Sequence, residues 1–473
     1  MSYSLQRCLS PLTKACLIIT SKFPGRFSVP SVQRQTTPQN QLTRALIPLP
    51  GDSAGVPPAA LTRFYRAYID CSPSESFVHT LGDLQEKYGD VVRVGPNELH
   101  FFSPAAYLEI FNANNRWDKE KSLYHSMGED RSSFGYLTYR EAKERKDILS
   151  RRFSKKAVVE GKKIVEGIIL GLCKTFEQNG STPVDLFYAF RCMTMDIITY
   201  FCFANSVDAV HTPNYKAPII LAMDASIGAF MRFNHANWYK NMIMNFPPKL
   251  SKIISPATAG HVDLQTLLKK QIEDLCTDPT KLAKLPHNTT IYHELFRPEV
   301  YRNGTAPDSG SLYEELQALM FSGADTTGAT LMHGSFYILQ LEKLPYLTAV
   351  IKESLRINPG VASPLPRVTI VMHASHFVHR NPNVFENPDE FRPERWLGEL
   401  GRSLDKWLLS FSRGPRSCLA LPGAELYLGY GHVYRKFDTE IDLSSPKELE
   451  WRDCFLPEYV GPPLRAKMTH VSA

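Results

Sequence analysis

The sequence predicts a mainly helical chain with a small β component. Apolar residues recur at helical spacing through residues 312–341, the longest such stretch, and through most of residues 139–204. Strand-like alternation occurs in residues 90–101, which turn at Gly95-Pro96-Asn97, and again in the segment that follows residue 434. Because helical periodicity dominates, we expect the strands to form only small sheets.

Composition narrows the class of protein. The chain has 473 residues, of which 43% are hydrophobic, and a formal net charge of +6. These values are typical of a globular protein with a large core. Like charges do not form blocks, so we expect no nucleic-acid binding. The nine cysteines include no C-x-x-C pair, which argues against a zinc site or a disulfide framework and favours a reducing compartment.

The N-terminal segment differs from the rest of the chain. We expect residues 1–56 to be a basic, disordered leader and residues 57–473 to form one domain. Residues 1–51 contain no Asp or Glu but several Lys and Arg, a composition that fits an organelle transit peptide. We favour the alternative, a plain unstructured leader or a segment unrelated to the domain that follows. We find no apolar run of the length, about 18 residues, that spans a bilayer.

Several shorter elements are expected along the chain. The longest helix should be capped by Ser311, with Glu314 and Glu315 in its first turn at the positive end of the helix dipole. Further helices are expected at residues 59–68, 75–88, 345–357 and 424–434. Residues 205–300 are expected to be irregular apart from a helix at 263–276. After residue 357 we expect a proline-rich loop that extends to about residue 400.

The first candidate functional motif lies at residues 411–418 and ends in Cys418. Cys418 follows a Gly414-Pro415 turn and precedes a predicted helix. The N-terminus of that helix, together with Arg413 and Arg416, should lower the pKa of the thiol below its ordinary value. A thiolate is a strong metal ligand. A buried, inert cysteine is the alternative for a cysteine considered alone.

Two further motifs lie on predicted helices. Glu353 and Arg356 share one helix face at i and i+3, where a surface ion pair would be the ordinary explanation. Residues 322–327 place a glycine and two threonines inside the longest helix, where they are poor helix formers. Thr326 can hydrogen-bond the carbonyl one turn back and open the helix locally. Helix packing through small residues is the alternative.

Taken in order, these motifs resemble those of the cytochromes P-450. Residues 411–418 match the haem-binding signature, and Glu353-x-x-Arg356 is followed by Arg395 within Pro-Glu-Arg. The resemblance implies a cytochrome P-450 fold over residues 57–473 and haem b (heme, iron-protoporphyrin IX) as the cofactor. It implies that Cys418 is the iron ligand, that Phe411 packs beside the haem and that Gly414 forms the turn next to it. It also implies a buried structural network of Glu353, Arg356 and Arg395, proton delivery by Asp325 and Thr326, and a close approach of haem and dioxygen to the helix backbone at Gly323 and Ala324. The haem propionates would bind Arg367, Arg416 and either Lys143 or Lys146.

The same resemblance implies a function. It implies a haem-thiolate monooxygenase that takes electrons from NADPH-cytochrome P-450 reductase and inserts one oxygen atom into a lipophilic small molecule. Residues 117–125 and 134–143 look like those of fungal, secondary-metabolism members similar to the trichodiene oxygenases. We expect a monomer on the cytosolic face of the endoplasmic reticulum, with a mitochondrial leader as the alternative. A hydrolase would need a G-x-S-x-G elbow, which we do not find, and the pairing of His373 with His376 lacks further metal ligands.

The sequence also departs from the family pattern. Only residues 342–344 separate the two helices between which the family has additional helices. Strands that line the substrate pocket are missing between Arg367 and His379, and Ala420 replaces an expected glycine. A gene model that lacks exons would explain these departures. An inactive P-450-like protein that binds haem poorly or not at all would explain them as well.

Overall fold

The computed structural model describes residues 63–72, 75–278, 280–285, 290–338, 347–358, 360–367, 370–419 and 422–471. Helices dominate this part of the chain, which confirms the predicted fold class. The helices are α4 (Phe64–Cys71), α5 (Phe77–Tyr88), α6 (Pro104–Ile110), α7 (Lys121–Tyr124), α8 (Tyr139–Ser150), α9 (Lys155–Asn179), α10 (Leu186–Phe203), α11 (Pro218–His235), α12 (Asn237–Asn245), α13 (Pro248–Ile254), α14 (Ala259–Thr277), α15 (Thr280–Ala283), α16 (Ile291–Leu295), α17 (Ser309–Ile338), α18 (Leu347–Ile357), α19 (Ser375–His379), α20 (Gly398–Leu404) and α21 (Pro422–Lys436). The leader and residues 342–344 lie outside the described residues.

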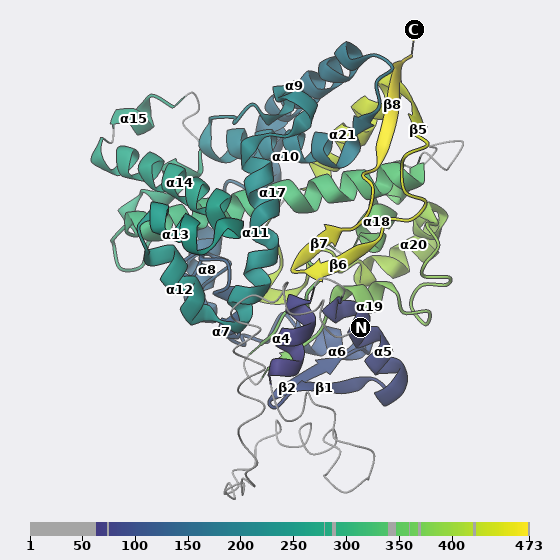
Figure 1. The fold of residues 1–473 in the computed structure, drawn as a ribbon, viewed down its shortest axis with the longest axis horizontal. Coiled ribbons are helices and arrows are strands. Elements are labelled where there is room, and N and C mark those ends of the chain that lie inside the picture. The colour runs from purple at the N-terminus through teal and green to yellow at the C-terminus, as the bar shows by residue number, and fades with distance from the viewer. Residues whose placement is uncertain are drawn as a thin grey trace, which may run out of the picture. The chain divides into compact units, whose positions relative to one another are not determined.

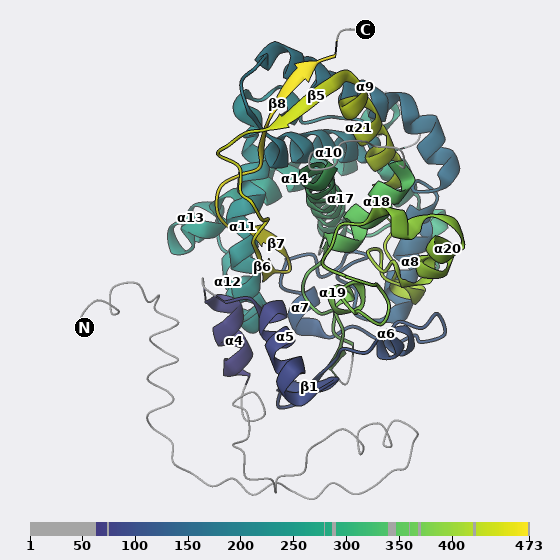
Figure 2. The ribbon, with the colours of Figure 1, turned by 90° about the vertical axis from the view of Figure 1, so that its right-hand side faces the viewer.

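Helix α17 is the centre of the described fold (Figures 1 and 2). Helices α10, α14, α18 and α21 pack against it. From Ser311 to Phe336, every position of α17 is buried except Ser322 and Thr326. A helix that is apolar on all sides is stable only when neighbouring elements cover all of its faces. The two exceptions lie one turn apart, so they mark a single open stripe on an otherwise enclosed helix.

The strands form three small sheets, as expected. Strands β1 (Val91–Gly95) and β2 (Glu98–Phe101) form an antiparallel hairpin in which Val92 lies opposite His100, and β4 (Val371–Met372) adds in parallel to β2. Strands β3 (Val184–Asp185) and β5 (Phe437–Ile441) both pair antiparallel with β8 (Arg465–His470). Strands β6 (Trp451–Cys454) and β7 (Leu456–Tyr459) form the third sheet. Between Arg367 and His379, the two-residue β4 is the one strand in the described residues.

The start of α17 differs from the prediction. Asp308, and not Ser311, provides the cap, because its carboxylate accepts a hydrogen bond from the backbone N–H of Ser311 at 3.0 Å. Glu314 and Glu315 lie in the first turns of α17, as expected, but both side chains are buried. Glu315 pairs with the buried Arg145 of α8 at 3.2 Å, an interaction between segments far apart in the sequence.

Residues 205–300 were expected to be irregular, and this prediction was wrong. Helices α11, α12 and α13 occupy residues 218–254, and α14 extends the expected helix at both ends. Helix α11 buries residues on several sides, including Ile220, Met223 and Phe230, because it packs between α4, α10 and α14. A helix buried on several sides has no simple apolar stripe, so its period is hard to detect.

Helix α10 has a strongly apolar composition. Among the described residues, it is the one helix that is long and apolar enough to cross a membrane, and 83% of it is buried inside the structure. It packs between α9 and α17 and carries Arg191 and Asp196 within its span. The apolar composition of α10 is therefore explained by its place in the protein core.

Candidate functional site

The loop that carries Cys418 is held in a defined shape by its backbone. The N–H of Cys418 donates to the carbonyl of Phe411 at 2.8 Å, which closes the loop. Gly414 adopts a positive φ of 72°, and a Cβ atom there would lie 2.6 Å from the carbonyl oxygen of Phe111. Only glycine fits such a conformation and such an approach without strain. The loop thus presents the Cys418 side chain in an exposed position ahead of α21.

Four cations gather around this loop and near each other: Lys119, Lys146, Arg367 and Arg416. Lys146 of α8 donates to the carbonyl of Ser417, the residue before Cys418. Arg416 donates to the carbonyl of Leu137 at 3.0 Å, and the buried Arg367 donates to the hydroxyl of Tyr124 at 2.7 Å. Across the described ranges, the hydrogen bonds of these cations go to neutral oxygen atoms.

The electrostatics of this cluster favour an anionic ligand. Burial, followed by repulsion from Arg416 and Arg367, holds the pKa of Lys119 well below its ordinary value. Burial and the charge of Arg367 also lower the pKa of Arg416, whose buried Nε has no hydrogen-bond partner. Crowded, desolvated cations gain most from a ligand that brings negative charge, and arginine pairs with carboxylates through parallel hydrogen bonds. The cluster is suited to a ligand with carboxylate groups.

The structure distinguishes the two lysines that were considered together. Lys143 pairs with Asp147 one turn along α8, and both side chains are largely exposed to solvent. Lys146 lies on the side of α8 that faces the Cys418 loop. Lys119 was not predicted as part of the cluster, although it pairs with Arg367 across an isolated β-bridge. In the sequence, only the segment Trp117-Asp-Lys119 pointed to Lys119. Where that segment lies relative to the Cys418 loop depends on tertiary structure.

Glu353 of α18 is the centre of a buried hydrogen-bond network. Its carboxylate accepts hydrogen bonds from Nε and Nη2 of Arg356, at 2.9 and 2.7 Å, and from Nε of Arg395 at 3.1 Å. The indole N–H of Trp396 adds a bond of 2.8 Å. The side chains of Glu353 and Arg356 are entirely buried. Breaking a buried, hydrogen-bonded pair costs about 3–5 kcal/mol, so this network is a structural anchor rather than a surface ion pair.

The network reaches the Cys418 loop through backbone contacts. Arg356 donates to the carbonyl of His379 at 2.8 Å, and the ring Nε2 of His379 accepts from the N–H of Leu409 at 2.8 Å. The hydroxyl of Ser410, which precedes the loop, donates to the carbonyl of Leu355 in α18 at 2.7 Å. Helix α18 therefore holds the first residues of the cysteine loop in place.

On α17, Thr326 forms the predicted hydrogen bond but does not break the helix. Its hydroxyl donates to the carbonyl of Ser322 at 2.7 Å, and α17 continues without interruption from Ser309 to Ile338. Ser322 and Thr326 are the open stripe described above. A hydroxyl at this stripe can exchange protons with a ligand beside the helix.

Gly323 does not face this open stripe. A Cβ atom on Gly323 would lie 2.6 Å from Cγ1 of Ile198, so the glycine allows α10 to approach α17 closely. Ala324 is fully buried, and its carbonyl accepts a hydrogen bond from Thr194 of α10 at 2.7 Å. The expectation that Gly323 and Ala324 open the helix to a cofactor is therefore corrected. Helix packing accounts for both residues, because their faces of α17 are turned towards α10.

Asp325 is buried in an ion-pair cluster between three helices. It pairs with Arg191 of α10, which is fully buried and also contacts Asp224 of α11 at 2.6 Å. Tyr188 donates its hydroxyl hydrogen to Asp224 at 3.0 Å. Burial raises the pKa of Asp325, and the charge of Arg191 opposes that rise. Arg191 was not predicted, because α10 shows no motif around it.

The model of the cytochrome P450 family matches residues 67–340 and 333–458, and the chain belongs to that family. The chain is therefore a monooxygenase, an oxidoreductase that incorporates molecular oxygen. The two matched segments meet at the end of α17, where family helices were expected to be missing.

The chain is similar to several fungal proteins. The cytochrome P450 monooxygenase flvC of Aspergillus flavus is 29% identical over 430 residues, which cover 79% of this chain and 77% of that protein. The cytochrome P450 monooxygenase macH of Penicillium terrestre is 27% identical over 463 residues, covering 86% and 90%. The cytochrome P450 monooxygenase tpcC of Cochliobolus heterostrophus is 26% identical over 437 residues, covering 81% and 82%. The resemblance to fungal cytochromes P-450 is confirmed.

The family implies a haem cofactor, and the residues around Cys418 fit one. Haem carries two carboxylate groups and an iron atom with an affinity for thiolate. The cation cluster and the partnerless Nε of Arg416 suit the carboxylates, and the exposed Cys418 suits the iron. Ala420 lies outside the described residues, and α21 begins at Pro422.

Proposed function

We propose that this chain is a haem-thiolate monooxygenase in which the thiolate of Cys418 would hold the iron of haem b. The observation that carries the proposal is the closed loop of residues 411–418, which presents the exposed Cys418 next to the cation cluster. Bound haem would supply the oxygen activation, since a thiolate ligand favours O–O cleavage. The protein would supply the ligand, the orientation and the protons.

Specific side chains would carry these tasks. Lys119, Arg367 and Arg416 would bind the propionates, and Lys146 would add positive charge beside the thiolate. Phe411 would pack on the proximal side of the ring, and Gly414 would keep the loop narrow. The Thr326 hydroxyl, held by the Ser322 carbonyl, would pass a proton across the open stripe of α17, with Asp325 behind it.

The family and the surface support a proposal for the substrate and the partners. We propose a lipophilic small molecule of fungal secondary metabolism as the substrate and NADPH-cytochrome P-450 reductase as the electron donor, with the chain acting as a monomer. Attachment to the cytosolic face of the endoplasmic reticulum would suit the apolar side chains that α12 and α13 expose. Trp238 is 64% exposed and Ile253 is 76% exposed. Such side chains insert readily into the headgroup region of a bilayer.

A spectrum tests the proposal. The purified full-length chain is reduced under carbon monoxide, and its Soret band is recorded. We expect the red-shifted band of a thiolate-ligated haem, lost in Cys418→Ser and retained in Cys276→Ser, which changes an exposed cysteine of α14. A chain that takes up no haem would refute the proposal and support the alternative of an inactive relative. Thr326→Ala should then release more peroxide per electron consumed, and unchanged coupling would remove Thr326 from proton delivery.

A further inference from the structure

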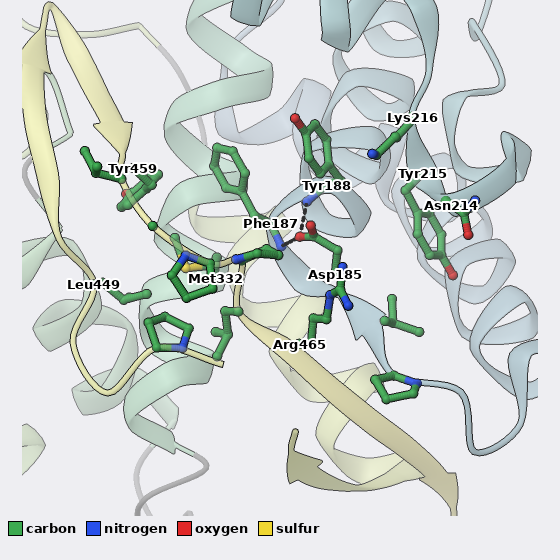
Figure 3. Close-up of a pocket in the computed structure, with 18 of the residues that line it drawn as sticks. Asp185, Phe187, Tyr188, Asn214, Tyr215, Lys216, Met332, Leu449, Tyr459 and Arg465 are labelled. Carbon is green, nitrogen blue, oxygen red and sulfur yellow. Dashed lines mark hydrogen bonds between the residues drawn. The ribbon is translucent and has the colours of Figure 1, made fainter. Parts of the chain in front are cut away.

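An open cavity of about 740 Å³ lies beside the start of α10 (Figure 3). Its walls come from α9, α10, the loop before β6 and the loop between β7 and β8, and Met332 of α17 contributes to its floor. We call it the outer cavity. The lining of the outer cavity includes Phe187, Tyr188, Leu449 and Tyr459. The cysteine loop does not contribute to its lining.

A second, much smaller cavity adjoins the open stripe of α17. It has a volume of about 20 Å³ and is lined by Asp325, Thr326 and Ala329 of α17 together with Arg191 of α10. We call it the inner cavity. A cavity of this size with several polar groups in its wall holds about one water molecule. Oδ2 of the buried Asp325 has no hydrogen-bond partner within the described protein, so a water molecule in the inner cavity would satisfy it.

Phe187 and Tyr459 line both cavities. Their rings meet edge to face, with centroids 5.2 Å apart. Each ring is held from one side: the Arg191 guanidinium lies 4.7 Å from the Phe187 centroid, and the Tyr459 hydroxyl lies 3.0 Å from Nδ1 of His333. The pair is therefore a thin aromatic wall between the outer cavity and the surroundings of Asp325.

The hydrogen-bonded side chains next to this wall do not offer a proton path. Tyr188 contacts Asp224, and Asp224 contacts Arg191, which pairs with Asp325. The two carboxylates raise the pKa of Arg191 above its ordinary value, although burial opposes them. Because Arg191 keeps its protons, it can orient Asp325 but cannot relay a proton to it. Protons must then arrive at Asp325 with water, and the open outer cavity lies on the other side of the aromatic wall.

We propose that the outer cavity is a solvent entrance to Asp325 and Thr326, and that Phe187 and Tyr459 form its gate. The proposal rests on the proposed function for the roles of those two residues. Rotation of either ring would join the two cavities and let a water molecule exchange. Side-chain rotations of this kind are local motions that need no change of the helices.

Thiol labelling measures access to the inner cavity directly. Ala329→Cys places a thiol in its wall, and the haem-loaded full chain is treated with methyl methanethiosulfonate. Peptide mass spectrometry gives the labelling rate at position 329 relative to that of the buried native Cys173, so that general loosening of the fold cancels. With Phe187→Ala added, we expect this ratio to rise about tenfold, because the wall loses one of its two rings.

Leu449→Ala is the matched control, since Leu449 lines the outer cavity but not the inner cavity. An unchanged ratio in Leu449→Ala, with a rise in Phe187→Ala, supports the gate. No rise in Phe187→Ala, or an equal rise in both variants, overturns it. If Phe187→Ala does not fold, Tyr459→Leu is read in its place. A chain with the thiolate-type Soret band but no rise in labelling would refute the entrance and leave the proposed function standing.

Discussion

The Ser410 hydroxyl donates to the backbone carbonyl of Leu355 at 2.7 Å, which joins α18 to the loop that carries Cys418. This bond connects the Glu353 network to the proposed iron ligand. We expect Ser410→Ala to lower the free energy of unfolding by about 1 kcal/mol, the worth of one partly buried hydrogen bond. Haem should also be lost faster from the variant, because the loop before Cys418 is less firmly held.

Denaturant unfolding and the rate of haem transfer to excess apomyoglobin check this expectation. Ser403→Ala is the control, because the Ser403 hydroxyl bonds the carbonyl of Leu400 within α20 and is exposed. Haem loss as slow as in the wild type would show that the Ser410 bond does not support the loop.

The pairing of Arg191 with Asp325 predicts that a substitution at Asp325 will restore part of the stability lost when Arg191 is replaced. Arg191→Met leaves a buried carboxylate without its cation, which should cost about 3–5 kcal/mol of stability near neutral pH. The pKa of Asp325, already raised by burial, should rise further. A carboxyl whose folded pKa exceeds its unfolded pKa loses stability as pH rises through that interval. The deficit of Arg191→Met should therefore grow between about pH 4 and pH 7.

Thermal unfolding across this pH range provides the measurement. Adding Asp325→Asn to Arg191→Met should recover part of the lost stability at pH 7 and remove the additional pH dependence. A double variant less stable than Arg191→Met at pH 7 would contradict the role given to Arg191, which is to neutralise Asp325.

Lys119 predicts opposite effects with and without haem. Its buried ammonium group lies among other cations, and burial and Arg416 hold its pKa well below the ordinary value. Lys119→Met should stabilise the haem-free chain by about 1–3 kcal/mol, since the variant buries no amine among other cations. The same variant should release haem faster, because one propionate contact is lost.

The control is Lys121→Met, which removes an exposed lysine at the start of α7. Melting temperatures of the haem-free chain and haem-transfer rates of the loaded chain decide the outcome. Faster haem release without stabilisation of the haem-free chain would mean that Lys119 is not under electrostatic stress.

Glu129 predicts a pH dependence of stability. It is buried, and burial raises its pKa to about 8, with the charges of Glu315 and Glu314 adding to the rise and the hydrogen bond from Gln317 opposing it. The folded chain therefore holds a proton that the unfolded chain has released above about pH 4.5. Stability should fall as pH rises from about 5 to 8, and Glu129→Gln should reduce that fall.

Melting temperatures of the haem-loaded chain at pH 5.5 and pH 8 test this, with the exposed Glu86→Gln as the control. An equal fall in the wild type and in Glu129→Gln would assign the pH dependence to other groups.

Motifs contiguous in sequence predicted much of the site. Glu353 and Arg356 lie one turn apart on one helix, and the Gly414 turn precedes Cys418 directly, so local geometry relates them without the rest of the fold. The partners that come from distant segments could not be predicted this way. Arg191, Lys119 and the choice of Lys146 over Lys143 all depend on how α8, α10 and α17 pack.

The Cys418 loop, the pairing of Glu353 with Arg356 and the mainly helical fold were determined by the sequence itself, because each depends on residue types at short, fixed spacings. Tertiary structure alone decided which side of α17 is open. We predicted from the sequence that Gly323 lies on the side of the cofactor, yet Ile198 of α10 occupies that side. The open stripe is formed by Ser322 and Thr326. A helical pattern shows which residues share one face of a helix. Which of these faces packs against a neighbouring helix depends on contacts with distant segments, and the pattern holds no information on those contacts.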